Sequence, residues 1–203
     1  MQPAELPSWA EQQAAALLTG LGDRWSHIQA VAEQGRRVSA ALAPEDRPYL
    51  IAAARLHDVG YAPPLNRLGF HPVDGARYVR EQGQERLASL VAYHSGARFE
   101  AEERGLVDAL AEFEPKDGPL LDALTYADMT TGPAGQRVDL EERIAEILER
   151  YPPADPVHRA IRRSHTMLRR RWTAPLPGCR PRPITARMCR VRREGVWLSS
   201  CSE

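Results

Sequence analysis

Lysine is nearly absent from this chain, which has only Lys116 among its 27 basic residues. A phosphate-binding P-loop needs a Gly-Lys-Ser or Gly-Lys-Thr segment, so that class of nucleotide-binding protein is excluded. Cysteine is also scarce, and no two cysteines form a Cys-x-x-Cys pair. All three fall within the last 25 residues, at Cys179, Cys189 and Cys201. No disulfide framework is therefore predicted.

Long apolar runs are missing as well. No segment approaches the roughly 18 uninterrupted apolar residues of a membrane-spanning helix, so we predict no membrane span. The first residues, Met1–Glu5, lack the basic start and apolar core of a signal peptide, and we expect a cytoplasmic protein. No stretch alternates between apolar and polar residues for long enough to predict a strand, and no internal repeat is visible. The expected fold class is all-α.

Charge is divided unevenly along the chain, although the total is zero. Residues 1–158 contain 15 basic and 25 acidic residues, whereas residues 159–203 contain 12 arginines and two glutamates. The segment 174–203 also holds four prolines within nine residues, which predicts a disordered Pro/Arg-rich tail. Because few aromatic residues accompany the arginines, we expect a solvated tail. Docking on the acidic body and binding of nucleic acid are the alternatives.

Apolar residues recur with helical spacing over most of the chain, and helix caps and breakers divide it into nine segments. We predict helices at 8–19, 23–42, 44–58, 71–83, 84–94, 101–113 and 119–129, followed by two helices that Asp139 and Asp155 cap. This pattern predicts a helical bundle over residues 1–173.

The apolar run that ends in His57-Asp58 is the feature around which the chain is organised. Leu50, Ala53, Ala54 and His57 fall at i, i+3, i+4 and i+7, so the histidine lies on the buried face of a helix. A buried carboxylate must be paired or bound to a metal, because its desolvation is costly. A lone His-Asp pair is most often a salt bridge or hydrogen bond, so the other histidines decide its interpretation.

Three further histidines fall on core faces or at helix ends, namely His27, His71 and His94. Asp128 lies on the apolar face of the helix that begins at Pro119. Four histidines and two aspartates are too costly to bury in an apolar bundle without a common partner. A metal centre provides one. Imidazole and carboxylate together suit iron, manganese, zinc or cobalt, whereas magnesium prefers oxygen.

The order His27, His57-Asp58, Asp128 resembles the HD superfamily of metal-dependent phosphohydrolases, over roughly residues 20–150. In that family these four positions bind one metal ion, and the aspartate of the pair can bridge to a second. The resemblance therefore implies an HD-domain helical bundle in which all four residues are metal ligands.

A subgroup of the family has two more histidines between the pair and the last aspartate. The segments around His71 (70–79) and His94 (92–96) are similar to those of the bacterial symmetric diadenosine tetraphosphate hydrolases. This resemblance implies that His71 and His94 hold a second divalent ion. We expect iron or manganese first, with zinc, cobalt or magnesium as alternatives. The same layout of six ligands also resembles di-iron oxygenases such as myo-inositol oxygenase.

For a hydrolase, the resemblance implies that Asp58 is the central catalytic residue, bridging two ions that activate a water for attack on phosphorus. The expected substrate is a small phosphorylated molecule such as a nucleotide, with Arg67 and Arg98 as candidate phosphate contacts. Two other functions stay open, a mixed-valent di-iron oxygenase and a non-catalytic metal-binding module. We interpret His158 and His165, on the arginine-rich last helix, as non-catalytic.

Overall fold

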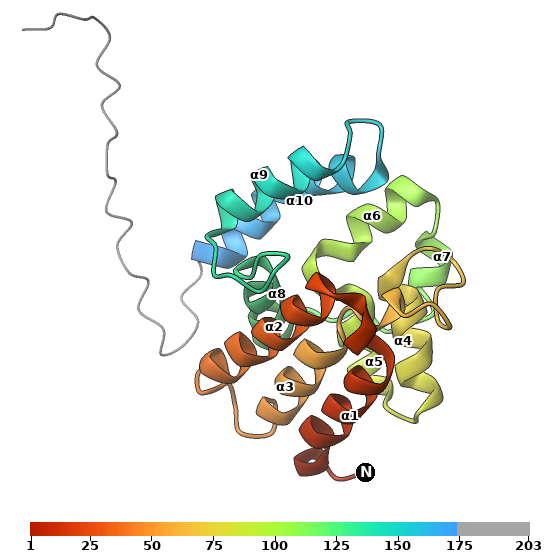
Figure 1. The fold of residues 1–203 in the computed structure, drawn as a ribbon, viewed down its shortest axis with the longest axis vertical. Coiled ribbons are helices and arrows are strands. Elements are labelled where there is room, and N and C mark those ends of the chain that lie inside the picture. Colours follow the sequence, from red (N-terminus) through yellow and green to blue (C-terminus); the bar gives the residue numbers. More distant parts are fainter. Residues whose placement is uncertain (174–203) are drawn as a thin grey trace, which may run out of the picture.

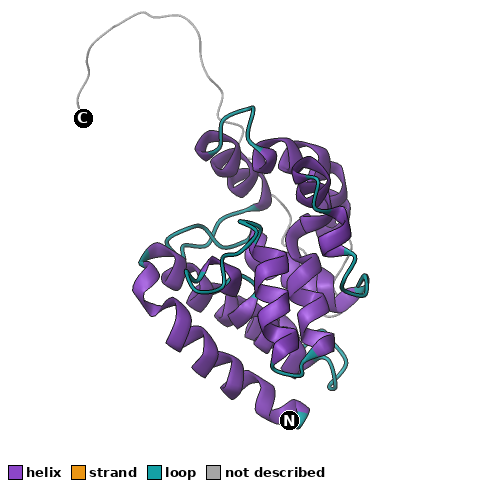
Figure 2. Ribbon diagram, turned by 90° about the vertical axis from the view of Figure 1, so that its right-hand side faces the viewer, coloured by secondary structure: helices purple, strands orange, loops and turns teal. Residues whose placement is uncertain are grey.

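The computed structural model describes residues 1–173, which are built from helices and loops with one isolated β-bridge (Figures 1 and 2). The all-α prediction is confirmed. The α-helices are α1 (Leu6–Leu18), α2 (Asp23–Ser39), α3 (Arg47–Leu56), α4 (His71–Glu81), α5 (Glu85–Tyr93), α6 (Ala97–Arg104), α7 (Val107–Leu110), α8 (Pro119–Met129), α9 (Leu140–Arg150) and α10 (Pro156–Thr173). Short 3-10 helices are η1 (Pro3–Glu5), η2 (Thr19–Leu21), η3 (Val59–Tyr61) and η4 (His94–Gly96). The predicted tail and the three cysteines lie outside the described residues.

Helices α1 to α5 and α8 form the body of the molecule (Figure 1). Helix α3 lies between α1 and α2, and α8 packs against both α2 and α3. The core side chains are fully buried, among them Ile28, Leu50 and Leu124. A Cβ at Gly35 of α2 would lie 3.2 Å from the Cβ of Ala54, so small residues let α2 and α3 approach closely. This packing places the N-terminal part of α2, which carries His27, next to the C-terminal end of α3, where His57 follows.

Helices α9 and α10 form a separate layer over one side of the body (Figure 1). Their apolar faces and Met129 of α8 make a second core, distinct from the first. Its other buried residues are Leu140, Ile144, Ile147, Ile161 and Leu168. Helix α10 is also tied to α6 by ion pairs from Arg159 and Arg163 to Glu103. No helix in residues 1–173 is long and apolar enough to cross a membrane.

The predicted helix at 101–113 is wrong, because the structure has two helices there. Gly105 adopts the left-handed conformation with φ of 69°, and its N–H and that of Leu106 close the end of α6. Apolar residues keep their helical spacing across this glycine, so the sequence pattern does not show that one helix ends and another begins here. The described residues therefore contain ten α-helices rather than nine. The predicted helix from residue 23 also ends earlier, at Ser39 instead of 42.

Both predicted caps near the end of the domain are present. The Asp139 carboxylate accepts a hydrogen bond from the N–H of Glu142 (2.8 Å), and the Glu142 carboxylate accepts one from the N–H of Asp139. This reciprocal pair is a capping box. The Asp155 carboxylate accepts from the N–H of Val157 (2.7 Å) at the start of α10. These caps fix where α9 and α10 begin.

Candidate metal centre

The structure brings together all six predicted ligands, which come from five different helices or helix ends. Their donor atoms form two groups, and within each group these atoms lie within 4.8 Å of one another. One group is His27, His57 and Asp128, and the other is Asp58, His71 and His94. The side chain of Asp58 lies between the groups, with Oδ2 3.6 Å from His57 Nε2 and Oδ1 3.4 Å from His71 Nε2.

Gly60 makes the approach of Asp58 to His71 possible. The chain turns through η3 directly after Asp58 and passes against the start of α4. A Cβ at Gly60 would lie 2.1 Å from the backbone oxygen of His71 and 2.7 Å from the nitrogen of Gly75. No residue with a side chain fits in this space, so a glycine is needed where the two metal-group segments cross.

The rings of His57 and His94 are held in the same way. The Nδ1–H of His57 donates to the carbonyl of Ala54 (3.0 Å), and the Nδ1–H of His94 donates to that of Val91 (2.6 Å). Each ring is therefore the tautomer whose Nε2 carries a lone pair. The Nε2 of His57 is buried and has no hydrogen-bond partner within the described part of the chain. A buried acceptor without a partner is rare, and a metal ion would satisfy this one.

In the second group, Asp58, His71 and His94, the ring nitrogens also face one another and a carboxylate. The Nε2 of His71 lies 3.3 Å from the Nε2 of His94 and faces the Asp58 carboxylate. Burial lowers the pKa of His57 and holds the pKa of His71 well below its ordinary value, so both rings are neutral at pH 7. The neutral ring of His71, the Nε2 of His94 and the Asp58 carboxylate point at one another, an arrangement that fits a shared cation.

His27 differs from the other histidines because both of its nitrogens face acceptors. Its Nδ1 lies 3.0 Å from the carbonyl of Gly132, and its Nε2 lies 3.1 Å from Oδ1 of Asp128. Burial opposes protonation, but the hydrogen bond to Asp128 and its charge raise the pKa of His27 above the ordinary value. A proton on Nε2 thus occupies the place that a cation would take in this group.

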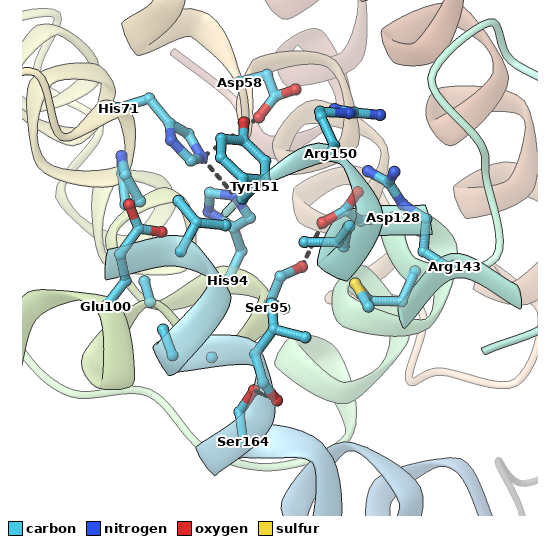
Figure 3. A pocket seen from close by; sticks show the side chains of 18 of the residues that line it. Asp58, His71, His94, Ser95, Glu100, Asp128, Arg143, Arg150, Tyr151 and Ser164 are labelled. Carbon is cyan, nitrogen blue, oxygen red and sulfur yellow. Dashed lines mark hydrogen bonds and ion pairs between the residues drawn. The ribbon is translucent and has the colours of Figure 1, made fainter. Parts of the chain in front are cut away.

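Ser95 connects the two groups, and the sequence analysis missed it. Its hydroxyl donates to Oδ2 of Asp128, while its backbone N–H donates to Oγ1 of Thr125 (3.3 Å) (Figure 3). Within residues 1–173 it is the only non-glycine residue with positive φ (48°). Such backbone strain is concentrated at functional sites. This contact occupies Oδ2 and leaves Oδ1 of Asp128 directed at His27. In the sequence, only the Ser-Gly pair directly after His94 could have indicated a role for Ser95.

Arg24 is the second residue that was missed. Its Nη1 donates to Oδ2 of Asp58 (2.6 Å), and its guanidinium lies 3.9 Å above the ring of Tyr61. That ring stacks on His71 with 4.2 Å between centroids. Burial alone would raise the pKa of Asp58, but His57 and Arg24 hold this pKa well below its usual range. The spacing of three residues between Arg24 and His27 places both on one helix face and was a usable signal.

The model of the family described as HD domain matches residues 24–153, which is more than half of the chain. The chain belongs to the HD domain family. The predicted family is thereby confirmed, whereas the nearer likeness to the diadenosine tetraphosphate hydrolases stays a prediction. Searches of curated proteins and of solved structures gave no match.

The HD domain has a cleft that opens onto both metal-ligand groups. One wall includes five of the six predicted ligands, all except the fully buried His57, together with Arg24, Tyr61 and Ser95. The opposite wall comes from the α9–α10 layer and contributes Arg143, Ile147, Arg150, Tyr151, Val157, Ala160, Ile161 and Ser164 (Figure 3). The cleft therefore joins a histidine-rich wall to a wall of mixed cationic and apolar character.

Arg67 and Arg98, the predicted phosphate contacts, do not line this cleft of the HD domain. Helix α5 ends at Tyr93 and the chain turns at Ser95, so Arg98 leaves the face of His94 and lines a different hollow beside Lys116. Arg67 lines a third hollow with Asp74 and Arg77. The arginines that reach the cleft are Arg24, Arg143 and Arg150. His158 and His165 contact the Tyr151 carbonyl and Glu141, respectively, and are not cleft residues.

Proposed function

We propose that this HD protein is a metal-dependent phosphohydrolase that cleaves a phosphoester or phosphoanhydride of a nucleotide-like substrate. Members of the HD family are mostly metal-dependent hydrolases. The observation that carries the proposal is the convergence of six histidine and aspartate donors, among them the partnerless Nε2 of His57. Five of the six line a cleft that also holds three arginines.

The proposed ligands of one divalent ion are His27, His57 and Asp128, and the second group would hold another. We propose iron or manganese, with zinc, cobalt or magnesium as alternatives. When bound, such ions lower the pKa of a water towards neutrality and neutralise charge on a phosphoryl group.

Asp58 is the proposed central residue, because its carboxylate faces both groups. The pairing with Arg24 keeps this carboxylate ionised and fixes its orientation. The Arg24 side chain is 26% exposed, so the guanidinium also remains accessible to an anionic substrate from the cleft. The Tyr61 ring lies between the Arg24 guanidinium and the His71 imidazole and stacks on both of these side chains.

An oxygenase with a mixed-valent di-iron centre would use the same six ligands. The three arginines of the cleft favour a phosphorylated substrate instead, since guanidinium groups match phosphate in charge and geometry. A non-catalytic module is disfavoured by the intact set of six donors around an open cleft.

The test is a phosphate-release screen over nucleotides, dinucleotides and sugar phosphates, with protein purified without air and reconstituted with manganese or iron. Asp58→Asn should lower the turnover at least about 100-fold. Asp108→Asn, on the exposed α7, should leave it unchanged. Oxygen consumption with an organic substrate, and no phosphate release from any phosphoester, would refute the hydrolase and support the oxygenase.

A further inference from the structure

Two arginines of α9 point into the cleft from the wall opposite the metal ligands. Arg143 and Arg150 are seven residues apart, with Ile147 between them at spacings of four and three, so all three share one face of the helix. All three line the cleft. Figure 3 shows Arg143 beside Asp128 and Arg150 above it. A ligand at the metal centre would therefore have these guanidinium groups next to it.

Arg143 is buried more deeply than an arginine on a surface helix usually is. It is 8% exposed, and its Nε–H has no hydrogen-bond partner within the described residues. Leaving a buried donor unsatisfied costs about 1–3 kcal/mol, more for a charged group. Arg143 thus carries an unsatisfied charged donor on a side chain that lines the cleft, and an anionic ligand there would offset its positive charge.

Glu146 holds the two arginines in place. One of its carboxylate oxygens accepts from Nη1 of Arg143, and the other accepts from Nη2 of Arg150. A single carboxylate therefore orders two guanidinium groups and leaves the trio with one net positive charge. Such ordering before binding lowers the entropy lost when a ligand is held.

We propose that Arg143 and Arg150 form a second phosphate subsite, so that the preferred substrate carries two linked phosphates rather than one. This inference rests on the proposed function, in which the first phosphate lies at the metal centre. The second phosphate lies on the α9 arginines, and charge-assisted hydrogen bonds from guanidinium to phosphate hold it.

The experiment is isothermal titration of the manganese-loaded full chain with adenosine diphosphate and adenosine monophosphate. Arg143→Gln should weaken binding of the diphosphate about tenfold to 100-fold, the equivalent of one charged hydrogen bond, and change monophosphate binding less than about twofold. Arg150→Gln should act in the same direction and serves as the test if the buried Arg143 variant does not fold. The exposed Arg137 provides the matched control, and Arg137→Gln should alter neither affinity.

Equal losses for both ligands, or no loss for either, would overturn the subsite. The outcome is separable from that of the proposed function, because titration needs no turnover. A selective loss of diphosphate binding in a protein that releases no phosphate would refute the hydrolase but keep the subsite. Phosphate release together with equal effects of the variants on both ligands would keep the hydrolase but refute the subsite.

Discussion

Replacement of Ser95 has two opposite effects on stability: a hydrogen bond to Asp128 is lost, and backbone strain can be relieved. Two variants separate these effects. In Ser95→Ala, Asp128 loses a charge-assisted hydrogen bond, which we expect to destabilise the metal-free protein by about 1.5–3 kcal/mol. The left-handed backbone stays strained. In Ser95→Gly the hydrogen bond is lost as well, but the strain, about 1 kcal/mol for a residue with a side chain, is relieved. The glycine variant should therefore be more stable than the alanine variant by about 1 kcal/mol.

Metal binding should not follow the same order. Both variants lose the contact that directs Oδ1 of Asp128 at His27, so manganese affinity should fall about tenfold in each. Urea unfolding of the metal-free protein measures the first effect, and isothermal titration with manganese measures the second. Ser39→Ala removes only a local hydrogen bond at the end of α2 and should change neither. A glycine variant no more stable than the alanine variant, or unchanged affinity in both, would refute the reasoning.

Three further outcomes are expected. A chelator should lower the melting temperature of the metal-loaded protein, because ions that bind only the folded chain stabilise it; an unchanged temperature would count against bound metal. Gly60→Ala should destabilise by more than about 2 kcal/mol in urea unfolding, since its Cβ would overlap the backbone of His71 and Gly75, whereas Gly20→Ala, with open space around it, should change stability by less than about 0.5 kcal/mol. As pH falls, the ion at the His27 group should be lost first, because the pKa of His27 is raised whereas that of His71 in the other group is lowered. Metal content measured across pH checks this, and loss from the other group first would contradict it.

Helical periodicity was sufficient to predict that several of the candidate ligands are buried. The burial of His57 and His94 follows from their place on apolar helix faces, because a helix of fixed pitch determines which side chains share a face. The confirmed family membership accounts for the order of the other donors. Packing of α2, α3 and α8 brings His27, His57, Asp58 and Asp128 together, and the contacts of α4 with η3 and of η4 with α8 add His71 and His94.

The substrate side of the cleft was beyond the reach of the same reasoning. Arg143 and Arg150 reach the centre only because α9 packs with α10 into a second core over the body, which is a long-range event that local spacing does not encode. Arg98, by contrast, was predicted to reach the site from local spacing alone, and it lies outside the cleft. Its spacing from His94 assumed a continuous helix, but the chain turns at Ser95, where the sequence shows only a helix stop.

Elemental analysis of the full chain purified without air tests the central claim most directly. Two groups of donors predict two transition-metal ions per chain, and His57→Ala should remove at least one of them while the far-ultraviolet circular dichroism stays helical. A folded protein that binds no metal ion, or a His57→Ala variant that keeps the full complement, would contradict the account.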